Sequence, residues 1–246
     1  MEVHHHGHIE HSSIWKQYLS QFLMLFLAVF CGTLAEYYLD HNLENEKEEQ
    51  YAHSMIQDLD EDLINIDIDI QNKTQRIQNA DSLTAALLKG DKNDLGKIYF
   101  WARKIAVLGH NYIMTDGTLM ELKSSGNLRL IKSKSLVDSI QTYYNVYQQS
   151  EKAQVFSIEE LDHYRQQMIE VFDVRVFDKM IKHFPKIEMP EGNPALFNND
   201  PVLINRFLMR VELTKTSATI NLALLKKLKK SAINLRNIIN KKYEVE

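Results

Sequence analysis

The longest apolar run of the chain lies near its N-terminus. Residues 17–35, QYLSQFLMLFLAVFCGTLA, contain no charged side chain. As an α-helix this run is about 28 Å long, close to the thickness of the hydrocarbon core of a bilayer. Aromatic residues flank it at the depth where amphipathic rings prefer to lie: Trp15, Tyr18, Tyr37 and Tyr38. The pattern predicts a transmembrane helix over residues 17–39, preceded by a His-rich tail over residues 1–16.

A cleaved signal peptide and a buried core helix are the two alternatives to a membrane anchor. A signal peptide has a basic start, a shorter apolar run and a cleavage site between small residues. Here the run is long and continues into AEYYLDHNLENEKEEQ, which favours helix over a processed junction. We therefore expect an uncleaved, single-pass anchor.

The orientation of this anchor rests on few charges. Lys16 precedes the span and Lys47 is the next basic residue after it, so the count of basic residues is equal on the two sides. A short N-terminal tail inside and a large domain outside is the usual signal-anchor arrangement. We expect an inner (cytoplasmic) membrane protein with its N-terminus in the cytoplasm and its bulk domain in the periplasm.

The predicted span also carries a candidate surface for helix association. Cys31 and Gly32 form a notch of small residues that allows close approach of a second helix. Glu36 follows one turn later at headgroup level, where a carboxylate is tolerated, and a role in assembly or ion coupling is the alternative. The residues predicted to form the span and its packing surface are Phe22, Leu25, Phe26, Val29, Cys31, Gly32 and Glu36.

The remainder of the chain has helical rather than strand patterning. Residues 33–89 contain no Gly or Pro, which allows a helix of unusual length. Its apolar positions recur at mostly three- and four-residue spacing: Met55, Leu59, Leu63, Ile66, Ile70 and Ile77. A turn is predicted over 90–96, a shorter helix over 97–108, and a broken segment over 111–131.

The second half of the chain predicts further helices and one loop. Residues 136–184 again lack Gly and Pro; Ser135 with Asp138 resembles a capping box at their start, and Ser157 with Glu160 a second cap that divides them. All four prolines lie in a predicted loop over 185–201, and a helix of about 40 residues follows. The predicted fold is all-α, with the transmembrane helix running into an elongated antiparallel helical bundle over residues 40–246.

Composition and motifs argue against several classes of function. The net charge is −4, from 29 basic and 33 acidic residues, too balanced to indicate nucleic-acid binding. The single cysteine excludes disulfides within the chain. The sequence contains no phosphate-binding glycine loop, no nucleophile-elbow motif and no H-E-x-x-H motif. We therefore expect no enzymatic activity and no cofactor.

Three groups of residues are candidates for metal binding. The histidines of the tail, His4, His5, His6 and His8, have side chains that bind zinc, copper or nickel, although an unstructured tail supplies no supporting groups. Glu160 and His163 form one E-x-x-H pair, where a di-iron bundle needs two pairs and two further glutamates. Asp58, Asp60 and Asp62 resemble the start of a calcium loop, but the required glycine is missing. For each group we favour the simpler interpretation, a solvated tail or a solvated helix face.

Basic residues gather on the last predicted helix. They are Lys226, Lys227, Lys229, Lys230, Arg236, Lys241 and Lys242. These side chains are suited to anionic lipid or to an acidic partner. We favour pairing within the chain, with the acidic stretch from Asp58 to Asp69 of the first long helix.

Several segments together resemble a known family. They are the opening MEVHHH…FLMLFLAVFCGTLAE, the continuation of the span into EYYLDHNLENEKEEQYAHSMIQDLDEDL, and the run DGTLMELKSSGNLRLIKSKSLVDSIQTYYN. They are similar to a family of single-pass, helix-rich membrane proteins of the Bacteroidota. The resemblance covers the tail, the anchor and roughly the first 120 residues of the domain. It implies a helical domain on a membrane stalk and no catalytic or binding residue.

These observations lead to two expectations of function. The first is an accessory or scaffold subunit that contacts membrane lipid and associates with a membrane protein complex or with further copies of itself. The alternative is an extracytoplasmic sensory or ligand-binding module that signals through a partner protein, because the tail before Lys16 is too short to be an output domain.

Overall fold

The structure is a computed structural model that describes residues 11–90, 92–107, 111–181 and 186–243. The chain divides into two compact units, residues 1–51 and 52–246. Helix α1 (His11–Lys89) contributes to both units. The all-α prediction is confirmed, because the elements found in the described ranges are helices and no strand is among them.

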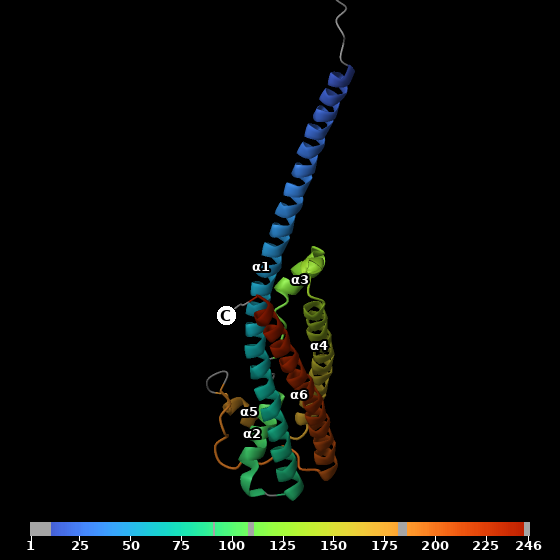
Figure 1. The fold of residues 1–246 in the computed structure, drawn as a ribbon. Coiled ribbons are helices and arrows are strands. Elements are labelled where there is room, and N and C mark those ends of the chain that lie inside the picture. The colour runs from blue at the N-terminus through green and yellow to red at the C-terminus, as the bar shows by residue number, and fades with distance from the viewer. Residues whose placement is uncertain (1–10, 91, 108–110, 182–185, 244–246) are drawn as a thin grey trace, which may run out of the picture. The chain divides into compact units, whose positions relative to one another are not determined.

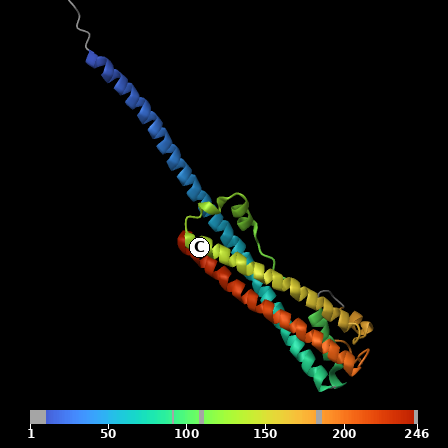
Figure 2. The same cartoon turned by 90° about the vertical axis from the view of Figure 1, so that its right-hand side faces the viewer.

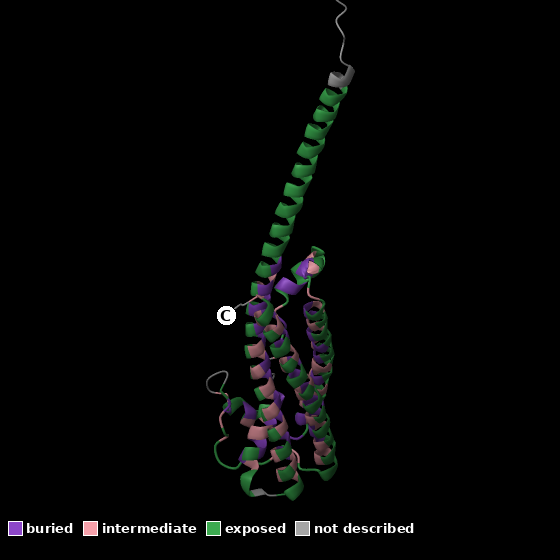
Figure 3. Cartoon of the chain, viewed as in Figure 1, coloured by how far each residue is buried: buried purple, intermediate pink, exposed green. Residues whose placement is uncertain are grey.

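The first unit consists of the N-terminal part of α1. The predicted helix of unusual length is confirmed: α1 has 79 residues. Residues 15–47 of this helix are all exposed (Figure 3). The apolar side chains of residues 17–35 are therefore exposed along the helix.

The second unit is built around three long helices. The residues of α1 from Ala52 onward lie beside α4 (Lys134–Met168) and α6 (Pro201–Tyr243), as Figures 1 and 2 show. Helix α6 is antiparallel to α1, because Asp60 pairs with Arg236 while Asp81 pairs with Lys215. The predicted antiparallel packing of long amphipathic helices is confirmed for this unit.

Shorter elements complete the second unit. They are η1 (Lys92–Asp94), α2 (Leu95–Ala106), α3 (Gly117–Ser124), η2 (Asn127–Leu130) and α5 (Val174–Lys179). Helices α2 and α5 lie at the end of the bundle where α1 terminates, and α3 lies at the opposite end of the bundle (Figure 1). The predicted short helix over 97–108 thus begins two residues earlier, at Leu95, and ends at Ala106.

An aromatic cluster forms the core at the α2–α5 end. The ring of Tyr99 lies 5.0 Å from that of Phe172, and the ring of Phe172 lies 5.4 Å from that of Phe207. Tyr164 packs on Phe207 at 5.3 Å. The Tyr99 hydroxyl donates to the carbonyl of Ala195 at 2.9 Å, so the cluster also holds the proline-rich loop. Edge-to-face and tilted ring pairs of this kind stabilise a core beyond the gain from burying the rings' apolar surface.

Two predicted caps on α4 are wrong. The helix begins at Lys134, and the Oγ of Ser133, not of Ser135, accepts the backbone N–H of Leu136 at 3.3 Å. Ser157 does not divide the helix, because α4 continues through it to Met168. Ser157 is buried and its Oγ lies 3.4 Å from that of Ser217 on α6, so contact between helices explains this serine.

The helices within residues 136–184, a stretch that lacks Gly and Pro, also end earlier than the sequence suggests. Helix α4 ends at Met168, and Asp173 caps the separate helix α5 by accepting the N–H of Arg175 at 2.9 Å. Pro201 is the first residue of α6, a position where the missing N–H of proline has no helical partner to lose. Of the predicted loop over 185–201, residues 186–201 are described, and Pro201 belongs to α6 rather than to the loop.

Candidate functional site

The predicted membrane span is a fully exposed helical surface. Among the described residues, α1 is one helix that is long and apolar enough to cross a membrane, and none of its most apolar window is buried. Phe22, Leu25, Phe26 and Val29 are each between 54% and 69% exposed. The rings of Phe22, Phe26 and Phe30 stack along the helix with centroids 6.3 and 5.9 Å apart. Such a surface suits lipid or another apolar helix.

The small notch on this helix is open. A Cβ added to Gly32 meets no atom within 4 Å, and Cys31 and Glu36 are exposed. A glycine inside a helix costs about 1 kcal/mol relative to alanine. No described contact within the chain explains why the helix carries glycine here. Close approach of another helix is one explanation that fits the geometry.

A line of charged and polar side chains runs through the interior of the bundle along α1. Four of its members lie on α1 at the spacing of the buried apolar stripe, and all four are buried: Asp62, Asp69, Lys73 and Arg76. Each interacts with the segment that links α2 to α3 or with α4. These four residues, with their partners, are named here the α1 polar line.

Asp62 is the centre of the first group in this line. Its Oδ1 accepts the backbone N–H of Thr115 at 2.8 Å, and its Oδ2 accepts the hydroxyl of Tyr143 on α4. The hydroxyls of Tyr143 and Tyr112 lie 2.9 Å apart. Burial raises the pKa of Asp62 although these hydrogen bonds oppose the change, and burial likewise raises the pKa of both tyrosines. Because the group is closed to solvent, its hydrogen bonds serve to hold the segment between α2 and α3 against α1 and α4.

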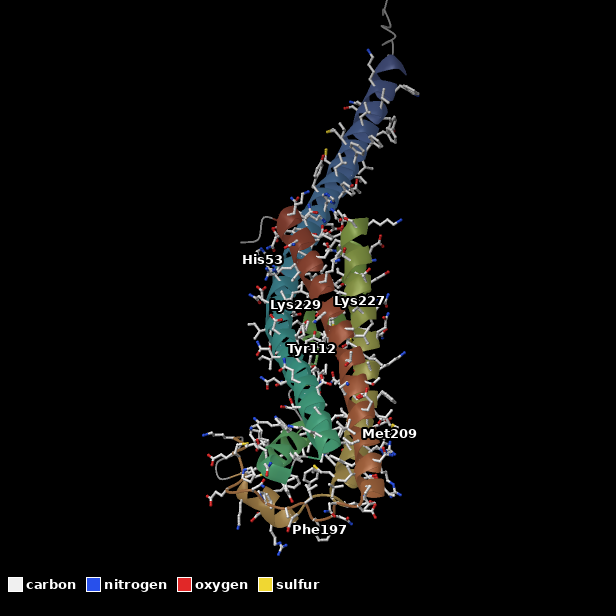
Figure 4. The ribbon with its side chains drawn as sticks, turned by 90° about the horizontal axis from the view of Figure 1, so that it is seen from below. His53, Tyr112, Phe197, Met209, Lys227 and Lys229 are labelled. Atoms are coloured by element: carbon white, nitrogen blue, oxygen red, sulfur yellow. The ribbon has the colours of Figure 1, made fainter. Side chains whose placement is uncertain are left out.

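Asp69 and Lys73 form the second group. The Nζ of Lys73 lies 3.0 Å from Asp69 and donates to the amide oxygen of Asn111 at 2.9 Å. Asp69 also accepts the N–H of Tyr112 at 3.2 Å. Burial lowers the pKa of Lys73, and the neighbouring Asp69 opposes this. Figure 4 labels Tyr112, which contributes its backbone to this group and its hydroxyl to the first.

Two arginines hold the C-terminal end of α2. The guanidinium of Arg76 donates to the carbonyl of Val107 at 3.0 Å, and that of Arg165 on α4 donates twice to the carbonyl of Ala106, at 2.9 and 2.7 Å. The last carbonyls of a helix lack helical partners and carry partial negative charge. The α1 polar line therefore fixes α2 and the following segment between α1 and α4.

Two open grooves lie at the α2–α5 end of the bundle. One, of about 550 Å³, is lined mainly by apolar side chains of α1, α2 and α6, including Leu87, Ile98 and Ile204. The other, of about 470 Å³, lies between α2, α5 and the end of α4, and Arg103 and Asp178 line it together with apolar side chains. Volumes of this size are typical of small-molecule sites.

The structure separates the candidate metal ligands. Asp58 and Asp62 accept backbone N–H groups of Thr118 and Thr115, whereas Asp60 pairs with Arg236 at 2.7 Å. His163 is exposed while Glu160 is half-buried. Within the part of the chain that the structure describes, no three His, Cys, Asp or Glu side chains gather as a metal site. The tail histidines His4, His5, His6 and His8 lie outside the described residues.

Pairing of the basic last helix with the first is confirmed at two positions. Lys229, labelled in Figure 4, contacts both carboxylate oxygens of Asp67 at 2.6 and 2.7 Å. Arg236 pairs with Asp60. Lys226, Lys227 and Lys230 are exposed on α6. These pairs run between antiparallel helices, as the charge pattern predicts.

Sequence reasoning missed the α1 polar line and the two grooves. A signal for the polar line was present, because Asp62, Asp69, Lys73 and Arg76 interrupt an apolar stripe at three-, four- and seven-residue spacing. Their partners, however, lie at distant positions in the sequence. Comparison of the chain with protein-family models, with curated proteins and with solved structures found no match.

Proposed function

We propose that this chain is a membrane-anchored helical accessory or scaffold subunit, which acts by associating with other proteins in or at the membrane. The observation that carries the proposal is the apolar N-terminal part of α1, exposed throughout residues 15–47, with an open notch at Gly32. In a membrane, small residues of this kind let two helices approach closely. The proposed partners are lipid and either a larger membrane complex or further copies of the chain.

The bundle supports the same proposal. Polar side chains in its interior bond to its own backbone: Asp62 accepts the N–H of Thr115, and the half-buried Arg165 donates to the carbonyl of Ala106. Such bonds suit a rigid body. The resemblance to single-pass, helix-rich membrane proteins agrees with an anchored helical domain. We assign no enzymatic activity to it.

The first experiment is extraction of the C-terminally tagged full chain from its native membrane in mild detergent, followed by mass analysis of the intact particle. If the chain is a scaffold subunit, we expect it to leave the membrane in a stable assembly, either with other proteins or as several copies of itself. A chain that leaves the membrane alone, as a monomer, contradicts it.

A substitution tests the part of the proposal that concerns the span. Gly32→Leu fills the open notch and should reduce the fraction of chain recovered in the assembly. Thr33→Leu is the matched control, because it adds bulk about 100° around the same helix. If Gly32→Leu leaves the assembly as intact as Thr33→Leu does, association through the notch is wrong.

We further propose that the protein lies in the inner membrane with its N-terminus in the cytoplasm and the bundle in the periplasm. Reporter fusions at the C-terminus test this sidedness. Alkaline phosphatase activity, which requires export, supports it, and fluorescence of a cytoplasmic green fluorescent protein fusion contradicts it.

A sensory or ligand-binding role is the second candidate function. The two open grooves of the bundle favour it, since each has the volume of a small-molecule site. A signal would pass to a partner protein in the membrane. Saturable binding of a small molecule to the full chain supports this function.

A further inference from the structure

Arg103, half-buried on α2, has different surroundings from Arg76, Arg165 and Arg236 of the same bundle. Arg76 and Arg165 donate to backbone carbonyls, and Arg236 pairs with Asp60. The guanidinium of Arg103 makes no hydrogen bond or ion pair among the described residues, and its Nε is buried without a partner. Its described contact is with the face of the Phe177 ring, 5.5 Å from the centroid.

This guanidinium lies in the groove between α2, α5 and the end of α4. The remaining lining is largely apolar, from Met168, Phe172, Phe177 and Ile181, and the groove has a volume of about 470 Å³. At the rim, Ile169 is 71% and Val174 75% exposed. Apolar side chains exposed beside a concave surface are typical of binding sites.

From these contacts we propose that the groove binds a small organic anion with an apolar body, whose carboxylate pairs with Arg103. An arginine fork matches a carboxylate in two-point geometry. The exposed apolar side chains of the groove, Ile169 and Val174, would contact the apolar body. This inference gives the second proposed function a ligand class and is independent of assembly through the span.

Asp178 gives the proposal a second, opposite test. Its exposed carboxylate lines the same groove, and no ion pair joins it to Arg103 in the described structure. A bound carboxylate would be repelled by Asp178 while it is attracted by Arg103. Removing the two charges should therefore change the affinity in opposite directions.

The experiment is calorimetric titration of the full chain in phosphatidylcholine nanodiscs with naphthylacetate and with its neutral amide, with empty nanodiscs as the blank. We expect saturable binding of the carboxylate, roughly tenfold tighter than the amide. Arg103→Gln should abolish this preference, and Asp178→Asn should tighten carboxylate binding about threefold. Arg129→Gln, an exposed arginine on η2, is the matched control and should change neither.

The proposal is overturned by the absence of saturable naphthylacetate binding, by equal affinity for acid and amide, or by an unchanged preference in Arg103→Gln. Circular dichroism of each variant reports whether the bundle is folded. If Arg103→Gln unfolds it, the exposed Asp178→Asn variant decides, because unchanged affinity there also contradicts the proposal. Assembly of the Gly32→Leu variant is measured separately. Failure of the anion-binding proposal can therefore be distinguished from failure of the scaffold proposal.

Discussion

Lys73 and Asp69 place two charges where water does not reach. Their side chains are 2% and 0% exposed, and the ammonium also bonds to Asn111. Removing one partner from such a pair leaves the other charge buried without compensation. The pair therefore ties the segment after α2 to α1 and makes the bundle sensitive to substitution here.

We expect Lys73→Met to lower the free energy of unfolding of the bundle by about 3 kcal/mol. The control is Lys97→Met, since Lys97 pairs with Asp94 at the surface, with 52% and 49% of the side chains exposed. The control should change stability by less than about 0.5 kcal/mol. Urea unfolding followed by Trp101 fluorescence, in a Trp15→Phe background, measures both. Equal losses would contradict a special role of the buried pair.

Asp62 makes stability depend on pH in a direction that can be worked out. Burial raises the pKa of Asp62 in the folded state, so the folded protein holds this proton more tightly than the unfolded chain. Its contribution to stability is present in full below the unfolded pKa and is lost as pH rises through the folded pKa.

Asp62→Asn removes this titration while keeping the side-chain shape. We expect the stability of wild type relative to Asp62→Asn to fall as the pH is raised from about 4 to 7. Asp138→Asn, at an exposed position of α4, is the control. Unfolding curves of the three proteins across this range provide the measurement. A constant difference between wild type and Asp62→Asn would show that Asp62 does not titrate as its burial implies.

Among the elements, the contact between α4 and α6 is partly polar. Ser150 and Ser157 of α4 and Thr214, Ser217 and Asn221 of α6 are all buried. The amide oxygen and nitrogen of Asn221 are both without a hydrogen-bond partner among the described residues. Buried groups of this kind cost about 1–3 kcal/mol each. This contact is therefore less stable than an apolar one of the same size.

Asn221→Leu should raise the free energy of unfolding by about 1 kcal/mol, because it removes two unpaired polar atoms at nearly constant volume. Asn237→Leu, exposed on the same helix, is the control and should change stability by less than about 0.5 kcal/mol. Thermal unfolding followed by circular dichroism compares them. Destabilisation by Asn221→Leu would indicate that the amide has a partner, such as an ordered water.

For the whole molecule, the division of α1 between two units has a measurable consequence. Residues 36–47 are exposed, whereas Met55, Leu59, Ile66 and Leu83 are buried in the bundle. Helical hydrogen bonds that no tertiary packing supports open at low free energy. Stability should therefore differ along one continuous helix.

Hydrogen exchange of the full chain in nanodiscs should show rapid exchange over residues 36–47 and slow exchange over 55–83. The bundle helices α4 and α6 serve as the internal reference, since their buried residues should exchange as slowly as those of α1. Uniform protection along α1 would contradict the expected difference in stability along this helix. It would indicate that residues 36–47 are covered by another chain or by lipid.

Much of the fold was predictable because it depends on local pattern. Gly90 ends α1, a three- and four-residue apolar spacing defines its buried face, and Pro201 begins α6. Of the predicted stripe, Met55, Leu59 and Ile66 are buried, while Leu63, Ile70 and Ile77 are half-buried. Helix ends were less predictable, as Ser133 and Ser135 offer the same capping chemistry and only the backbone path selects one.

Local pattern was sufficient to predict the helical class, the long apolar segment of the first helix, and the opposite charges of the first and last helices, because helical period, length and charge are carried by neighbouring residues. The packing of distant segments was needed to show that Asp62, Asp69, Lys73 and Arg76 are buried and which groups they bind. It also decided that Arg103 lies in a groove with no paired acid among the described residues. Burial and partner choice depend on contacts between segments far apart in the chain, so they follow from packing rather than from local pattern.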